Sequence, residues 1–317
     1  MKKAVIIKAL FLLSLFGADT QLPSKAYISS GSVVDMTAHE GKLYTATDAS
    51  CVDVFDLDTT KLVSQINVEK IKDFMGDLIH SKVYSIDAMK QRFVLLSQAS
   101  KGFRRVHIHT EGKNELLISE KDKLYVAKVR FLDENTLLLA LLGNQIISYD
   151  IKGKKQNWMA SVSQSKFSDF VINEERDEVV VADESGDLKI LSTKDGTLIK
   201  TLSGQNLDNV FQVDYKNGLI ATAGQDRRVV IYDTLFSSAY YKEAPFLIYS
   251  VGLSPSGKRV GYASDENNNV SVFDTVSKKT IGVYGGNKMT LSKVLFLNET
   301  EFLVSSDDRT INFYHIK

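Results

Sequence analysis

Residues 219–233, LIATAGQDRRVVIYD, have the pattern of a β-hairpin. A strand of small and apolar residues leads to a polar tip around Asp226, and a second apolar strand ends in Tyr232 and Asp233. Gly and Asp suit such a tip, because Gly readily adopts positive φ and an Asp side chain can cap the turn. The pattern therefore predicts two antiparallel strands joined by a tight turn.

The second strand of this hairpin recurs along the chain. The equivalent residues 55, 109, 149, 191, 232, 273 and 314 are separated by 54, 40, 42, 41, 41 and 41 residues. A multi-stranded repeat of about 40 residues is typical of a propeller blade. The seven copies are CVDVFD (51–56), RVHIHT (105–110), IISYD (146–150), DLKILS (187–192), VVIYD (229–233), VSVFD (270–274) and INFYH (311–315).

Further strands flank these hairpins, so each repeat predicts four antiparallel strands. The last copy reaches the end of the sequence with its third strand, and residues 25–29 (KAYIS) can supply the missing outer strand. Such sharing of one blade between the two ends of the chain protects the sheet edges and closes the ring. We therefore predict an all-β, seven-bladed β-propeller closed by an N-terminal strand. A large β-sandwich is the alternative, which the regular spacing disfavours.

The composition is that of a globular protein without a charge excess. The 317 residues are 44% hydrophobic, and 39 Lys and Arg balance 39 Asp and Glu. No overall field attracts nucleic acid or acidic membranes, so we expect neither as a general partner. The single cysteine, Cys51, excludes an intrachain disulfide.

The first 18 residues have the pattern of a secretory signal peptide. Lys2 and Lys3 precede an apolar run, and Gly17 and Ala18 are small residues suited to cleavage. We expect removal of residues 1–18, a single propeller domain over residues 19–317, a periplasmic location and no stable membrane insertion after cleavage. An uncleaved membrane anchor is the alternative.

The repeats resemble the WD40 family over nearly all of the chain after the signal peptide. The resemblance lies in repeat length, in the strand pattern, in turn aspartates such as Asp226 and Asp265, and in the aromatic-Asp endings at 55–56, 149–150, 232–233 and 273–274. No Gly-His dipeptide starts a repeat, and no Trp occupies the final position. The family is known for an Asp/His/Ser/Trp hydrogen-bond network. Because of these two departures, we expect that network to be mostly absent from this sequence.

In overall character the sequence is also similar to the NapL accessory proteins of periplasmic nitrate reductase systems. The shared features are a signal sequence, a seven-copy degenerate repeat and a lysine-rich, proline-poor composition. This resemblance implies a role in the assembly or maturation of the reductase, with a reductase subunit as a possible protein partner.

No residue pattern points to catalysis. There is no nucleophile elbow, phosphate-binding loop or dinucleotide fingerprint. His107 and His109 share one face of a strand but lack a third metal ligand, and the carboxylates at hairpin tips suit turn capping. We therefore predict no catalytic residues, no metal and no cofactor. The alternative is a propeller enzyme, lactonase-like or quinoprotein-like, which needs convergent polar groups in the central channel; an apolar channel would exclude it.

The irregular second repeat carries the best candidate for partner binding. Its extra length lies mostly at residues 68–81, and insertions on one face of a repeat protein commonly serve recognition. A packed loop is the alternative for this insertion, and a solvated face is the alternative for the two basic clusters nearby. The candidate partner-binding residues are the apolar Phe74, Met75, Leu78 and Ile79 and the basic Lys101, Arg104, Arg105, Arg227 and Arg228.

Overall fold

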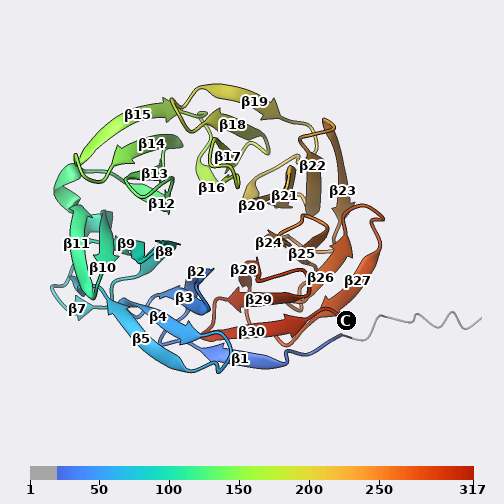
Figure 1. Ribbon diagram of the computed structural model, residues 1–317, viewed down its shortest axis with the longest axis horizontal. Coiled ribbons are helices and arrows are strands. Elements are labelled where there is room, and N and C mark those ends of the chain that lie inside the picture. Colours follow the sequence, from blue (N-terminus) through green and yellow to red (C-terminus); the bar gives the residue numbers. More distant parts are fainter. Residues whose placement is uncertain (1–19) are drawn as a thin grey trace, which may run out of the picture.

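A computed structural model describes residues 20–317, so the predicted signal peptide lies outside the described residues. Figure 1 shows seven four-stranded sheets arranged as blades around a central axis. Within each blade, neighbouring strands pair antiparallel, and they are ordered from the centre of the ring to its rim. The predicted all-β, seven-bladed propeller is confirmed.

The strands of blades 1 to 4 follow one another from the channel to the rim. Blade 1 contains β2 (Val33–His39), β3 (Lys42–Thr47), β4 (Cys51–Asp56) and β5 (Leu62–Asn67). Blade 2 contains β8 (Val83–Met89), β9 (Arg92–Gln98), β10 (Arg104–Thr110) and β11 (Lys113–Ile118). Blade 3 contains β12 (Val126–Phe131), β13 (Thr136–Leu141), β14 (Gln145–Asp150) and β15 (Lys155–Ser161). Blade 4 contains β16 (Phe167–Ile172), β17 (Glu178–Asp183), β18 (Leu188–Ser192) and β19 (Leu198–Leu202).

Blades 5 and 6 keep this order, and blade 7 combines both ends of the described chain. Blade 5 contains β20 (Val210–Lys216), β21 (Leu219–Gly224), β22 (Arg228–Asp233) and β23 (Ser238–Glu243). Blade 6 contains β24 (Val251–Leu253), β25 (Arg259–Ala263), β26 (Val270–Asp274) and β27 (Thr280–Tyr284). Blade 7 contains β28 (Leu291–Phe296), β29 (Glu301–Ser306), β30 (Thr310–His315) and β1 (Lys25–Ile28).

Strand β1 closes the ring as predicted. It pairs antiparallel with β30, from Lys25 opposite Phe313 to Ile28 opposite Thr310. The fully buried Tyr27 packs edge-on against Phe55 of blade 1 and donates a hydrogen bond from its hydroxyl to the Leu57 carbonyl at 2.7 Å. The closing strand is therefore held both by its own blade and by the next.

The insertion in the second repeat forms a small ribbon of its own. Strands β6 (Ile71–Lys72) and β7 (Leu78–Ile79) pair antiparallel between blades 1 and 2. Two short 3₁₀ turns, η1 (Ser100–Gly102) and η2 (Glu120–Asp122), are the only helical segments within residues 20–317. The insertion at residues 68–81 thus contains a two-stranded β-ribbon.

Apolar side chains fill the spaces between adjacent blades. One cluster joins Val180 and Ala182 of blade 4 to Val210 and Val213 of blade 5. Alternation along each strand places apolar residues on both faces, so every blade packs against two neighbours. This packing sets the distance of each innermost strand from the axis.

A chain of side-chain hydrogen bonds links the turn of blade 5 to the loop before the blade. Thr222 donates its hydroxyl hydrogen to the Asn206 side-chain carbonyl at 2.8 Å, and the Asn206 amide donates to Asp226 at 3.4 Å. Asp226 also accepts the Leu207 backbone N–H at 2.7 Å. Here Asn206 ties the loop before the blade to the turn between β21 and β22.

A β-bulge marks the innermost strand of six blades. In each of these strands the pairing register shifts between the first and the third residue, and a bulge of this kind re-aims the side chain that follows it. The third residues are polar in all six strands, although their neighbours are mostly apolar. They are Asp35, Ser85, Lys128, Asp169, Gln212 and Lys293.

Candidate functional site

The centre of the ring encloses a polar cavity of about 680 Å³. Its lining comes mainly from the innermost strands and from the loops that follow them. Acidic and basic side chains are equal in number, five of each, so the cavity is charged but balanced. They are Asp35, Asp87, Asp169, Glu174 and Asp214, with Lys128, Arg130, Arg176, Lys216 and Lys293.

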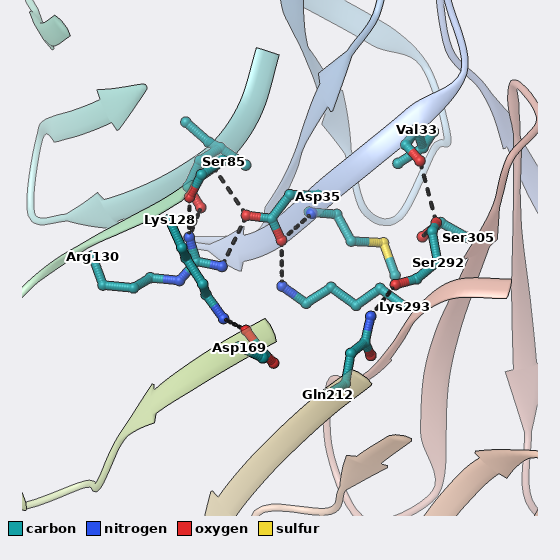
Figure 2. A network of polar contacts seen from close by, with 12 residues as sticks. Val33, Asp35, Ser85, Lys128, Arg130, Asp169, Gln212, Ser292, Lys293 and Ser305 are labelled. Atoms are coloured by element: carbon teal, nitrogen blue, oxygen red, sulfur yellow. Dashed lines mark hydrogen bonds and ion pairs between the residues drawn. The ribbon is translucent and has the colours of Figure 1, made fainter. Parts of the chain in front are cut away.

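Asp35 is the hub of a network that crosses this cavity (Figure 2). Its Oδ1 accepts a hydrogen bond from Lys293 Nζ of blade 7 at 2.6 Å, and its Oδ2 accepts one from Arg130 of blade 3 at 2.8 Å. The same Oδ2 accepts the Ile86 backbone N–H of blade 2 at 3.1 Å. One carboxylate of blade 1 therefore contacts three other blades.

The protonation of Asp35 follows from these contacts. Burial by itself would raise the pKa of the carboxyl group, but the positive charges of Arg130, Lys293 and Lys128 outweigh it and hold the pKa well below its ordinary value. Arg130 also donates to Ser85 Oγ at 2.5 Å. Asp35 is therefore ionised at neutral pH and compensated by cations from two blades.

A second ion pair lies beside the first. Lys128 Nζ donates to Asp169 Oδ1 at 2.5 Å and to the Phe170 carbonyl at 2.7 Å. Burial lowers the pKa of Lys128, and repulsion from Arg130 and Lys293 lowers it further, while Asp169 opposes both effects. The three cations of the network are thus close enough to repel one another.

Carboxylates of the innermost strands also join neighbouring blades through the backbone. Asp169 accepts the Val213 N–H at 3.1 Å, and Asp214 accepts the Leu253 N–H at 2.8 Å. Asp87 accepts the Phe131 N–H at 2.8 Å, and burial raises the pKa of its carboxyl group. Each of these bonds satisfies a donor on the inner edge of the next blade, which would otherwise face the channel unpaired.

The channel network was missed in the reading of the sequence. The signal was present, because a polar residue at the third position of an otherwise apolar strand recurs in six repeats. Only the bulge, which local sequence does not reveal, places those residues together at the axis. The channel is therefore not apolar, and the condition that would have excluded an enzyme is not met.

The structure brings the four predicted apolar residues together on the β6–β7 ribbon. Phe74, Met75 and Leu78 expose 96%, 73% and 65% of their surface, and Ile79 is also exposed. Asp73 Oδ1 holds the turn by accepting the backbone N–H groups of Met75 at 2.8 Å and Asp77 at 2.9 Å. The ribbon therefore presents apolar side chains to solvent from a defined turn.

The first basic cluster lies beside this ribbon. Arg105 pairs with Glu120 at 3.0 Å and with Glu69, just before β6, at 3.3 Å. The Arg104 guanidinium lies 4.0 Å from the centre of the Tyr84 ring, and Lys101 is exposed in η1. Arg105 thus serves as an anchor between the ribbon and blade 2, while Arg104 and Lys101 remain at the surface.

The second basic cluster is remote from the first. Arg227 and Arg228 lie at the start of β22, which Figure 1 places across the ring from β10. Arg228 stacks on Tyr241 at 4.1 Å and lies 3.7 Å from Glu243. A surface pocket of about 340 Å³ lies beside both arginines. The predicted basic residues therefore form two separate surfaces.

The paired histidines and the cysteine contact different partners in the described residues. His107 is hydrogen-bonded to Ser97 at 3.0 Å, and burial lowers the pKa of its imidazole to about 4. His109 instead contacts Asn114 at 2.7 Å, and Cys51 is buried with its pKa raised by desolvation. Within residues 20–317 no group of three or more His, Cys, Asp or Glu side chains is placed to hold a metal ion.

The tip carboxylates include one that is buried rather than solvated. Asp183 is fully buried and accepts hydrogen bonds from Asn144 at 2.9 Å and from Ser163 at 2.6 Å. It also accepts the Ser185 backbone N–H at 2.8 Å, which is the predicted turn-capping contact.

Among the described residues, no helix is long and apolar enough to cross a membrane.

Among the comparisons with known proteins, the one with solved structures finds a match, and it concerns the fold. No family model and no curated protein matches the sequence. Among solved structures, the β-propeller domain of Cps50 (Swd1) from Myceliophteria thermophila superposes with a TM-score of 0.75 at 13% sequence identity, covering 93% of this chain and 99% of that domain. At this identity the likeness concerns the fold alone. The protein therefore has the fold of a β-propeller, with the seven blades described above.

Proposed function

We propose that this protein is a non-enzymatic interaction scaffold that binds a protein partner through the β6–β7 ribbon. In its more specific form, the proposal is an exported accessory factor for the assembly or maturation of periplasmic nitrate reductase. The fold supports the general form, because β-propellers commonly mediate protein–protein interaction. The specific form is supported by the sequence resemblance described above.

The observation that carries the proposal is the exposure of large apolar side chains on one short insertion. Phe74, Met75 and Leu78 all lie within eight residues of Ile71, whose own side chain is buried. Full burial of such side chains contributes about 1.5–3 kcal/mol each. Part of that free energy offsets the entropy lost on association, so three anchors suit a specific complex of moderate affinity.

The enzyme alternative has one supporting observation, the charged cavity in the channel. Its carboxylates are occupied, however, because Asp35 and Asp169 are ion-paired and the other three accept backbone N–H groups; these are Asp87, Glu174 and Asp214. A general acid or base must be within hydrogen-bond reach of a substrate and free to exchange a proton. We therefore rank the enzyme second.

The proposal is tested by capture of the tagged protein from its native periplasm after crosslinking. The ribbon variant is Phe74→Ser with Met75→Ser. The matched control is Leu235→Ser with Phe236→Ser, which removes a comparably exposed apolar pair from the turn between β22 and β23. Both pairs are on the surface, so neither variant should unfold the ring.

We expect the unaltered protein and the control to capture a reductase subunit, and the ribbon variant to lose most of it. Capture of a different periplasmic protein, lost only with the ribbon variant, would keep the scaffold and reject the reductase. Equal capture by the ribbon variant and the control would refute the role of the ribbon.

A further inference from the structure

We propose that the centre of the channel is a binding site for a small oxyanion, either an inorganic oxyanion or a carboxylate. Its ligands are the ammonium groups of Lys293 and Lys128 and the side-chain amide of Gln212. These three side chains extend from blades 7, 3 and 5 toward the same part of the cavity (Figure 2). The proposal is independent of the scaffold function, which rests on the outer ribbon.

Three side chains of the network use only part of their hydrogen-bond donors. An ammonium group has three N–H donors and a side-chain amide has two. Lys293 Nζ uses one of them on Asp35, Lys128 Nζ uses two on Asp169 and Phe170, and Gln212 uses one on the Ser292 carbonyl at 2.5 Å. Two N–H groups on Lys293, one on Lys128 and one on Gln212 therefore have no protein acceptor within the described residues.

Asp35, the carboxylate that holds Lys293, is fully engaged, whereas Asp169 accepts one hydrogen bond on each oxygen. Each oxygen of Asp35 accepts two hydrogen bonds, from Lys293 and the Met36 N–H on Oδ1 and from Arg130 and the Ile86 N–H on Oδ2. A carboxylate offers about four acceptor sites, so Asp35 is saturated. It fixes the cations in place but cannot take up the remaining donors.

Local charge favours an anion as well. Ion pairs join the three cations Lys128, Arg130 and Lys293 to only two carboxylates, Asp35 and Asp169. Asp87 also attracts Arg130, but it forms no ion pair within the described residues, and burial raises the pKa of its carboxyl group. The repulsion among these cations is relieved by a negative charge placed between Lys293 and Lys128. The whole lining is neutral, so the attraction is confined to this part of the channel and does not extend into solvent.

The chemistry of the donors sets the class of ligand. Several N–H groups converge from different blades, and an oxyanion presents several acceptor oxygens at once, with stronger charge-assisted hydrogen bonds than a neutral ligand forms. A cavity of about 680 Å³ accommodates a small molecule with its hydration water. Chloride has the charge but lacks separate oxygen acceptors, so it serves as the reference anion.

The test is a thermal titration of the purified protein at pH 7 and constant ionic strength. Sulfate, phosphate, acetate and succinate each replace chloride in turn, and calorimetric titration gives the Kd. We expect at least one oxyanion to raise Tm saturably, by about 2–4 °C at a tenfold excess over Kd. A response to sulfate or phosphate identifies an inorganic ligand, and a response to acetate or succinate alone identifies a carboxylate.

Two variants locate the site. Gln212→Leu removes one free donor and the hydrogen bond to Ser292 but leaves every ion pair intact, so the ring should remain folded. Lys293→Met removes two free donors and a charge. Each should weaken the anion at least tenfold, whereas Lys61→Met on the exposed rim of blade 1 should not change the Kd. The proposal is overturned if no oxyanion gives a saturable rise in Tm, or if both channel variants bind it as the unaltered protein does.

Discussion

Replacement of Asp35 by Ala should destabilise the whole ring, because this carboxylate joins blade 1 to blades 2, 3 and 7. The substitution leaves Arg130 and Lys293 without their carboxylate and the fully buried Ile86 without an acceptor for its N–H group. Removal of one partner from a buried ion pair costs about 3–5 kcal/mol. The side chains concerned are only 10%, 15% and 25% exposed, so solvent screens the pairs weakly.

We therefore expect Asp35→Ala to lower the free energy of unfolding by about 3–5 kcal/mol and Tm by about 5–10 °C. Urea unfolding followed by tryptophan fluorescence and circular dichroism measures the change, provided that the two signals coincide. Asp214→Ala is the control, because Asp214 accepts the Leu253 N–H but forms no ion pair within the described residues; it should cost about 1–2 kcal/mol. If Asp35→Ala costs no more than Asp214→Ala, the network does not hold the blades together.

Three further predictions concern the same ring. Folding lowers the pKa of Asp35, so the stability that the ionised carboxylate contributes is present above the ordinary carboxyl pKa of 3.8 and is lost as the pH falls below it. Wild-type stability, measured by urea unfolding, should therefore fall between about pH 4 and 2, and Asp35→Asn should reduce that fall. Tyr27→Ala should cost about 3–5 kcal/mol in urea unfolding because it empties the contact between β1 and blade 1, whereas Tyr27→Phe should cost about 1 kcal/mol; equal effects would contradict this account of ring closure. Gly252→Ala places a methyl group 2.4 Å from the Val294 carbonyl oxygen of the next blade and should cost about 1–3 kcal/mol by the same assay, more than Gly261→Ala, where the nearest atom is a side-chain methyl at 3.2 Å.

The blade count and the closure could be predicted because both follow from local patterns. A hairpin tip such as that around Asp226 needs particular residues, and the strands on either side pair with their neighbours in sequence. The missing outer strand of the last repeat then leaves β1 as its completion, and the pairing of Lys25 with Phe313 confirms it. The position of the apolar ribbon could also be predicted, because its insertion lengthens one of the otherwise regular spacings between repeats.

The candidate site was harder to predict because its parts are distant in sequence. The two basic clusters look alike in the sequence, yet Arg105 is engaged by Glu69 and Glu120, whereas Arg228 belongs to β22, across the ring from β10. His107 and His109 share a strand but contact different partners. Side-chain partners of this kind depend on how neighbouring strands and blades pack.

The sequence by itself determined the number of blades, their order and the strand that closes the ring, because antiparallel meanders pair segments that are adjacent along the chain. Only the tertiary structure decided the chemistry of the channel. Asp35 meets Arg130 across 95 residues and Lys293 across 258 residues. The bulges in six of the seven innermost strands, including those that carry Asp35 and Lys293, turn side chains toward a common axis. Charges that are unremarkable along the chain become an ion-pair network because closure of the ring brings seven innermost strands together.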